Sequence, residues 1–299
     1  MGLPVYRIAI KDKDLKQMEN HIWSDRFFPA TLSNGNGSPQ AIRIRYRGGH
    51  TREYPKKSYE IRTSRATYHF NAEYDDPSLI RNALSFHFFN MIGVPSPSTQ
   101  HCVLQLNGVN QGVYLRIEGG ESNLFPRAQA SRPKHHLCRQ RQCHLRFEQR
   151  QHEYPENLAV FRIQADQRPR GRPSEADALH SEHPRQTGEN AGKTFGNQRL
   201  YMDNFLTWLS GAVLTGNYDG FRHNYTIFEY RKRKAYGFLP WDYEGTWGRN
   251  CYGKEVASNL VSIKGHNKLT GKVLAYSANR QRYKEILEET SPPPLPRIN

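Results

Sequence analysis

The chain has 299 residues and a formal net charge of +15, which suit one large domain or two lobes and favour an anionic partner such as ATP, an acidic protein or nucleic acid. No apolar run is long enough to span a membrane, and the amino terminus lacks the apolar core of a signal peptide. Four cysteines are too few for a disulfide framework at this length, so we expect a cytoplasmic protein at synthesis with no membrane partner.

The first candidate strand carries alternating arginines. Residues 41–47 (AIRIRYR) alternate arginine with apolar or aromatic residues, which predicts a strand with Arg43, Arg45 and Arg47 on one face. This face could bind an anion, although an ordinary basic surface hairpin is the simpler interpretation of these residues alone.

A glycine pair and a lysine pair follow this strand. Gly48 and Gly49 allow a tight turn, and residues 58–62 (SYEIR) predict a second strand, with Lys56 and Lys57 just before it. Glycine lets a backbone approach phosphate groups closely, and lysine offers them a point charge. The sequence does not separate the two lysines.

The rest of the first 118 residues predicts one helix and one hairpin. Residues 77–91 have an amphipathic helical pattern. Residues 102–106 and 112–117 predict two strands joined by a turn, and the second strand ends at Glu118. Glu118 is a candidate partner for the lysine or the nucleotide.

Residues 119–198 have a different composition from the rest of the chain. They contain 11 Leu, Ile, Val or Phe in 80 positions, below the roughly 20% that a segment needs to build a core. Composition alone predicts a disordered linker. We interpret the segment as the product of a shifted reading frame, with a divergent insertion as the alternative. Sequencing the gene across these codons distinguishes the two.

Residues 199–299 contain the densest group of chemically active side chains. Residues 200–214 predict a buried helix, and residues 225–230 and 235–239 predict two strands around a charged turn at 231–234. Asp219, Asn224 and Asp242 flank this hairpin, so its folding back brings them close together. Oxygen ligands that converge from separate segments suit a hard cation such as Mg²⁺.

The motifs GNYDGFRHNY and PWDYEGTWGRN, with IRIRYRGGHTREYPKKSYEIR upstream, resemble the CotH kinase family of spore coat proteins. The resemblance covers residues 3–118 and 200–289. It implies an α+β, atypical two-lobed protein-kinase-like fold, with a small lobe in 1–118 and a large lobe in 199–299. It also implies transfer of phosphate from ATP, with Mg²⁺, to serines of other coat proteins during coat assembly, in the mother cell and then in the spore coat.

The resemblance also implies roles for individual residues. An Asp, an Asn five residues later and an Asp after a hairpin follow the order of a kinase active site. Asp219 would then be catalytic and accept the substrate proton, while Asn224 and Asp242 would hold the metal. The cofactor-binding candidates are Lys57 as first choice, then Lys56, Arg47 and Glu118.

The carboxyl-terminal region is expected to be incomplete. Residues 280–289 predict a helix, after which SPPPLPRIN stops it. Members of the family continue with helical sequence, so this tail is interpreted as a second frame shift.

Two other functions remain open from the sequence. One is a catalytically inactive scaffold protein of the spore coat. The other, less favoured, is a nucleic-acid-binding protein that uses Arg43, Arg45, Arg47 and residues 231–234 as a phosphate-binding surface.

Overall fold

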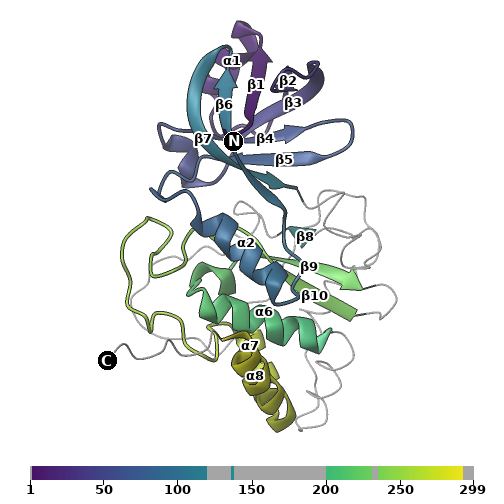
Figure 1. The fold of residues 1–299 in the computed structure, drawn as a ribbon, viewed down its shortest axis with the longest axis vertical. Coiled ribbons are helices and arrows are strands. Elements are labelled where there is room, and N and C mark those ends of the chain that lie inside the picture. The colour runs from purple at the N-terminus through teal and green to yellow at the C-terminus, as the bar shows by residue number, and fades with distance from the viewer. Residues whose placement is uncertain (1, 120–135, 138–199, 231–234, 292–299) are drawn as a thin grey trace.

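The alternating residues of the first 118 positions build a closed barrel of seven strands, shown at the top of Figure 1. The computed structural model describes residues 2–119, 136–137, 200–230 and 235–291. Most of 119–198, the turn 231–234 and the tail 292–299 lie outside these ranges, and the expectations made for them are therefore untested. The strands are β1 (Val5–Ile10), β2 (Phe28–Asn34), β3 (Gln40–Arg47), β4 (Ser58–Arg62), β5 (Thr67–Asn71), β6 (Thr99–Leu106) and β7 (Val109–Glu118).

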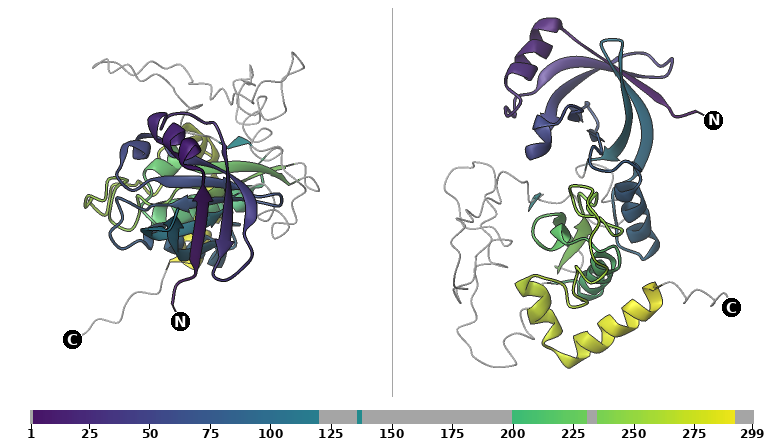
Figure 2. Two further views of the ribbon diagram at one scale, coloured as in Figure 1. Left: turned by 90° about the horizontal axis from the view of Figure 1, so that it is seen from above. Right: turned by 90° about the vertical axis from the view of Figure 1, so that its left-hand side faces the viewer.

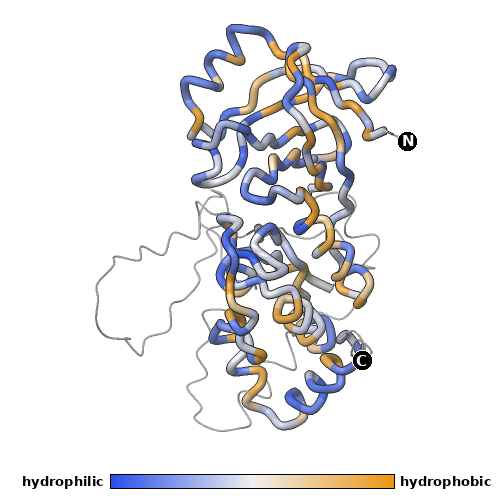
Figure 3. The backbone as a smooth tube through the Cα atoms, turned by 60° about the vertical axis from the view of Figure 1, so that its left-hand side comes forward, coloured by the Kyte–Doolittle hydropathy of each residue, from blue (hydrophilic) through white to orange (hydrophobic). Residues whose placement is uncertain are grey.

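The barrel follows the order β1-β2-β3-β4-β5-β7-β6 and closes where β6 pairs in parallel with β1. The other pairs are antiparallel. Hydrophobic and hydrophilic residues alternate along several of these strands (Figure 3), so one face fills the interior. Ile44, Ile61, Phe70 and Leu104 are fully buried there. Helix α1 (Asp12–Asn20) connects β1 to β2.

A second core lies below the barrel in Figure 1. It is formed by the helices α6 (Met202–Leu214), α7 (Lys268–Leu274) and α8 (Ser277–Thr290) and by the strands β9 (Tyr225–Tyr230) and β10 (Ala235–Pro240). The short strand β8 (His136–Leu137) pairs with β9. The right-hand view of Figure 2 shows the barrel and this second part arranged one above the other.

Helix α2 (Arg81–Met91) lies between the barrel strands β5 and β6 in sequence but packs into the second core. Phe86 and Phe89 of α2 are buried there together with Trp208 and Leu209 of α6. The contact between α2 and α6 is tight, because a Cβ added to Gly211 would lie 2.4 Å from the Phe89 ring. The second core therefore draws on residues from both ends of the chain.

Several predicted elements are confirmed and others differ. The hairpin of β9 and β10 pairs Tyr225 with Pro240 in antiparallel register, as its alternation predicts. Gly48 and Gly49 begin the connection between β3 and β4, and a 3₁₀ helix at His50–Glu53, absent from the sequence prediction, continues it. Helix α7 was not predicted. No helix within the described ranges is long and apolar enough to cross a membrane.

Candidate functional site

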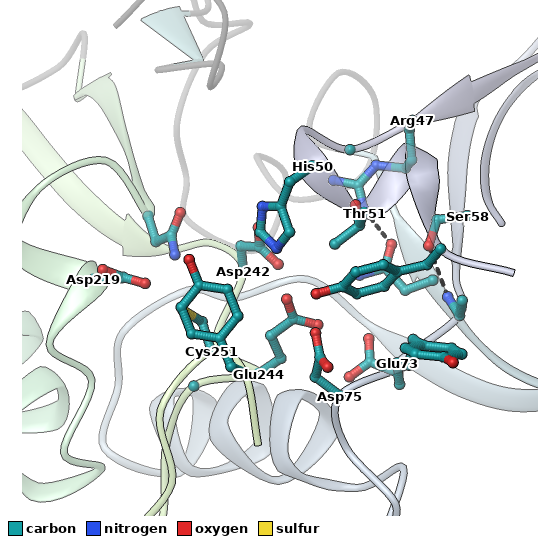
Figure 4. Close-up of a pocket in the computed structure, with 18 of the residues that line it drawn as sticks. Arg47, His50, Thr51, Ser58, Glu73, Asp75, Asp219, Asp242, Glu244 and Cys251 are labelled. Carbon is teal, nitrogen blue, oxygen red and sulfur yellow. Dashed lines mark hydrogen bonds between the residues drawn. The ribbon is translucent and has the colours of Figure 1, made fainter. Parts of the chain in front are cut away.

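A cavity of about 600 Å³ lies between the barrel and the second part of the molecule. Its walls come from the β3–β4 connection, the residues after β5, the loop after α6 and the loop after β10. Figure 4 shows Arg47 and Thr51 on one side and Asp219 on the other. This volume is typical of sites for small molecules and cofactors.

The hairpin brings the three expected acid and amide side chains into this cavity. Asp219 starts a 3₁₀ turn, and its carbonyl oxygen accepts from the backbone N–H groups of Arg222 at 3.0 Å and of Asn224 at 3.4 Å. The N–H of Trp241 then donates to the carbonyl of Asn224 at 3.2 Å, which places Asp242 beside it. Asp219, Asn224 and Asp242 all line the cavity.

Helix α2 holds the loop that follows Asp242. The Asn82 side chain accepts from the N–H of Tyr243 at 3.0 Å, and the Arg81 guanidinium donates to the carbonyl of Glu244 at 2.9 Å. The Trp247 indole donates to the Ser85 hydroxyl at 3.0 Å. These buried partners fix a loop in which Asp242 has φ of +59°, a region that non-glycine residues rarely adopt.

The barrel contributes two of the four expected cofactor-binding side chains to the cavity. Arg47 lines it, donates to the Asn71 side-chain oxygen and lies 5.9 Å from the centre of the Trp241 ring. Lys56 also lines it, and its ammonium donates to the carbonyls of Ala72 at 2.7 Å and Val113 at 2.5 Å. Burial lowers the pKa of Lys56, although the charge of Glu73 opposes the shift.

The other two expected cofactor residues lie outside the cavity wall. The Lys57 ammonium donates to the carbonyl of Arg52 at 2.6 Å. Glu118 accepts a hydrogen bond from the Ser98 hydroxyl at 2.5 Å at the end of β7. The geometry thus favours Lys56 over Lys57, which the sequence could not separate.

Arg45, the middle arginine of the predicted basic face, is buried. Its guanidinium pairs with Glu60 at 2.5 Å and with Asp25 at 3.3 Å. Arg45 is therefore neutralised by the buried Glu60 and the exposed Asp25, and its buried guanidinium does not form part of a surface for nucleic-acid phosphates.

An acidic cluster in the cavity was missed by the sequence interpretation. Glu73, Asp75 and Glu244 line the same space as Asp242 (Figure 4). Burial, followed by the charges of Asp242, Glu73 and Asp75, raises the pKa of Glu244, while Arg47 opposes it. The sequence does contain these acidic residues, in the run NAEYDD and two positions after Asp242. They were missed because neither segment has the periodic pattern of a strand or a helix.

Cys251 lies beside Asp219 in the same cavity (Figure 4). Burial and then the Asp219 carboxylate raise the pKa of its thiol to about 12. The thiol is therefore protonated at neutral pH and is a poor nucleophile.

The donors in the cavity suit a hard cation. Asn224 offers an amide oxygen and Asp242 a carboxylate, and the second side-chain oxygen of Glu73 (Oε2) is buried without a hydrogen-bond partner among the described residues. No group of three His, Cys, Asp or Glu side chains in the described ranges already surrounds a single ion position. These oxygen donors are of the type that Mg²⁺ prefers.

The comparisons with known proteins cover nearly the whole chain. The family described as CotH kinase protein matches residues 44–295. The inner spore coat protein H of Bacillus subtilis (strain 168) is 32% identical over 316 aligned residues, covering 97% of this chain and 81% of that protein. The inner spore coat protein H-like protein of the same strain is 44% identical over 68 residues, which are 21% of this chain and 22% of that protein.

The residues matched by the family include both sides of the cavity, from β3 to the loop after β10. The alignment with inner spore coat protein H extends the similarity to most of the residues outside the family match. This chain belongs to the CotH kinase family.

Proposed function

We propose that this chain is an ATP- and Mg²⁺-dependent protein serine kinase that phosphorylates serine-rich proteins of the spore coat and so contributes to coat assembly. The observation that carries the proposal is the convergence of Asp219, Asn224 and Asp242 on one cavity opposite Arg47 and Lys56. The similarity to a protein named inner spore coat protein H supports the spore coat as its place of action, after synthesis in the mother cell.

Asp219 is the proposed catalytic residue. Its backbone is held in the 3₁₀ turn, and its carboxylate faces the cavity, where it would orient a serine hydroxyl and accept its proton. His223 also lines the cavity, whereas Arg222 is exposed and bonds to Tyr218, so His223 is the better placed of the two to touch a substrate.

Asn224 and Asp242 would hold Mg²⁺, which neutralises phosphate charge when it is bound. Arg47 and Lys56 reach the cavity from the barrel and would bind phosphate oxygens. Because the Lys56 ammonium already donates to two carbonyls, one of its three N–H groups is left for such a bond. The positively charged side chains of Arg47 and Lys56 thus lie on the barrel side of the cavity, opposite the proposed Mg²⁺ ligands Asn224 and Asp242.

The test is transfer of label from γ-labelled ATP to a serine-rich coat protein. Asp242→Asn keeps the left-handed backbone conformation, which asparagine tolerates, but removes the carboxylate charge. We expect it to lower the transfer rate by at least about 100-fold, in the range measured for loss of one electrostatic group. Asp12→Asn, an exposed change in α1, is the matched control and should leave transfer unchanged.

Unchanged transfer by Asp242→Asn would contradict the kinase proposal. A scaffold role would instead be favoured by two results together. The unsubstituted chain would transfer no label, and coats would assemble normally in cells that carry either the unsubstituted chain or Asp242→Asn.

A further inference from the structure

Three buried side chains of the second part of the molecule have polar groups that the fold leaves unpaired. The indole N–H of Trp208, the side-chain amide nitrogen of Asn217 (Nδ2) and the hydroxyl of Tyr243 make no hydrogen bond with any described residue. Trp208 and Tyr243 are 0% exposed, and Asn217 is 1% exposed. A buried polar group without a partner costs free energy, so each of the three needs a hydrogen bond that the described side chains do not supply.

The three groups meet around Gly220. A Cβ added to Gly220 would lie 3.0 Å from the Tyr243 hydroxyl and 3.2 Å from Asn217 Nδ2, so both groups are on the same side of this glycine. Burial raises the pKa of Tyr243 and the Trp208 indole opposes this shift, which places the indole beside the hydroxyl. The Trp208 ring also packs on Phe221, the residue after Gly220, at 6.0 Å between ring centres. The unpaired groups therefore converge on one place.

The missing partner must mainly accept hydrogen bonds. The Trp208 indole and the Asn217 amide nitrogen can only donate, whereas the Tyr243 hydroxyl can donate or accept. The Asn217 amide oxygen is already in use, because it accepts from the N–H of Gly220 at 2.9 Å. A water molecule matches this set, since it can accept from Trp208 and Asn217 and donate to the Tyr243 oxygen.

An anion would also accept from these donors, but the neighbouring charges oppose it. Asp219 immediately precedes Gly220, and Asp242 immediately precedes Tyr243. The three donor groups are themselves neutral, and a buried ion without a charged partner is far more costly than a buried neutral molecule. The chemistry of the place thus favours water over an anion.

The same place lies between the two segments that carry acidic residues of the cavity. Asn217 is bonded to Gly220 in the Asp219 turn. Tyr243 belongs to the loop after β10, and its N–H donates to the Asn82 side chain of α2 at 3.0 Å. A water between the two side chains connects these segments to each other and to α6.

We propose that Trp208, Asn217 and Tyr243 hold one buried water molecule that joins the turn of Asp219 to the loop of Asp242. Its role is to keep the two segments at a fixed separation. Asn217 also lines the cavity, which gives the water a route of entry. The inference goes beyond the proposed function and does not depend on it, because the water belongs to the folded chain without nucleotide.

The test is magnetisation transfer from water to the Trp208 indole proton, in the nucleotide-free full chain with isotope-labelled tryptophan. Because Trp208 is fully buried, we expect a rotating-frame Overhauser cross-peak to water there only if a water molecule lies beside the indole. The chain has four tryptophans. Trp23→Phe, Trp241→Phe and Trp247→Phe each remove one indole signal, and the signal that remains in all three variants belongs to Trp208.

Tyr243→Phe removes the acceptor of the water but keeps its two donors. The cross-peak at Trp208 should persist in this variant, with the indole proton frequency shifted. The matched control is Tyr283→Phe, which removes another buried hydroxyl, one that donates to the carbonyl of Ile263 at 2.8 Å. It should leave both the frequency and the cross-peak of Trp208 unchanged. The other indole signals report whether each variant is folded.

Absence of a water cross-peak at Trp208 in the unsubstituted chain would overturn the proposal, whatever the variants do. A cross-peak that disappears in Tyr243→Phe would overturn it too, because the transferred proton would then belong to the hydroxyl and the indole would bond to the tyrosine directly. Either result leaves the kinase proposal standing, since labelled transfer tests that proposal separately through Asp242→Asn.

Discussion

Cys251 reports on the charge of Asp219, because the carboxylate and burial together keep its thiol protonated. Neutralising Asp219 by Asp219→Asn should lower the thiol pKa, enlarge the thiolate fraction at pH 8 and speed alkylation by iodoacetamide several-fold. Peptide mass spectrometry separates Cys251 from the other cysteines, and buried Cys102 serves as an internal control. An unchanged alkylation rate at Cys251 would mean that Asp219 does not act on the thiol.

Asn82 is the residue whose loss should cost the most stability near the site. Its amide serves both Glu73 and the N–H of Tyr243 from a fully buried position. Asn82→Ala leaves these groups unpaired and opens a small void, so the free energy of unfolding should fall by about 3 kcal/mol in urea titrations. The exposed turn change Asn36→Ala should alter it by less than about 0.5 kcal/mol. Equal effects of the two substitutions would rule out the bridging role of Asn82.

At the scale of elements, the packing of α2 on α6 depends on Gly211. A methyl group there would meet the Phe89 ring at 2.4 Å, and Phe89 is itself fully buried. Gly211→Ala should therefore lower the free energy of unfolding by about 2 kcal/mol, despite the better helix propensity of alanine.

Gly271 in α7 is the matched control for this substitution. It is exposed, helical and has no atom within 4 Å of an added Cβ. Gly271→Ala should raise the free energy of unfolding by about 0.5–1 kcal/mol, as helix propensity alone predicts. If both substitutions stabilise the protein, α2 and α6 are not packed as described.

Elements with a local pattern could be predicted from the sequence, and those set by tertiary contacts could not. Strands β3, β4, β9 and β10 are short runs of alternating or β-prone residues bounded by glycine, proline or charged residues. Their positions could therefore be predicted closely from the sequence. The 3₁₀ helix at His50–Glu53 is held by the Arg52 side chain, which donates to Gly48, Ile22 and Ser24 carbonyls. The contacts with Ile22 and Ser24 connect residues far apart in sequence and have no periodic signal.

The residues of the candidate site likewise include some that a local pattern predicts and others that only tertiary contacts bring to the cavity. Asp219, Asn224 and Asp242 flank a recognisable hairpin, so their convergence could be predicted. Glu73 belongs to the site because α2, through Asn82, joins it to the loop after β10, and this contact spans more than 150 residues. The choice between Lys56 and Lys57 likewise depended on which ammonium reaches the cavity.

At the scale of the whole molecule, local charge and total charge have opposite signs. The chain carries +15, yet seven acidic side chains line the cavity against four lysine or arginine side chains. Divalent cations should therefore bind despite the basic surface, and saturating Mn²⁺ should raise the unfolding temperature by roughly 5 °C. Asp242→Asn should lose most of this rise, and a scan with EDTA provides the baseline. An equal rise in both proteins would place the bound ions elsewhere.

In the proposed reaction, this cavity transfers a phosphoryl group and Asp219 accepts the serine proton. Single-turnover transfer from γ-labelled ATP to a serine-rich coat protein, compared between the unsubstituted chain and Asp219→Asn, tests it most directly. We predict that Asp219→Asn binds the nucleotide with unchanged affinity but transfers at least about 100-fold more slowly, since general base catalysis is lost while the cation ligands remain. Transfer by Asp219→Asn at the unsubstituted rate would contradict the account.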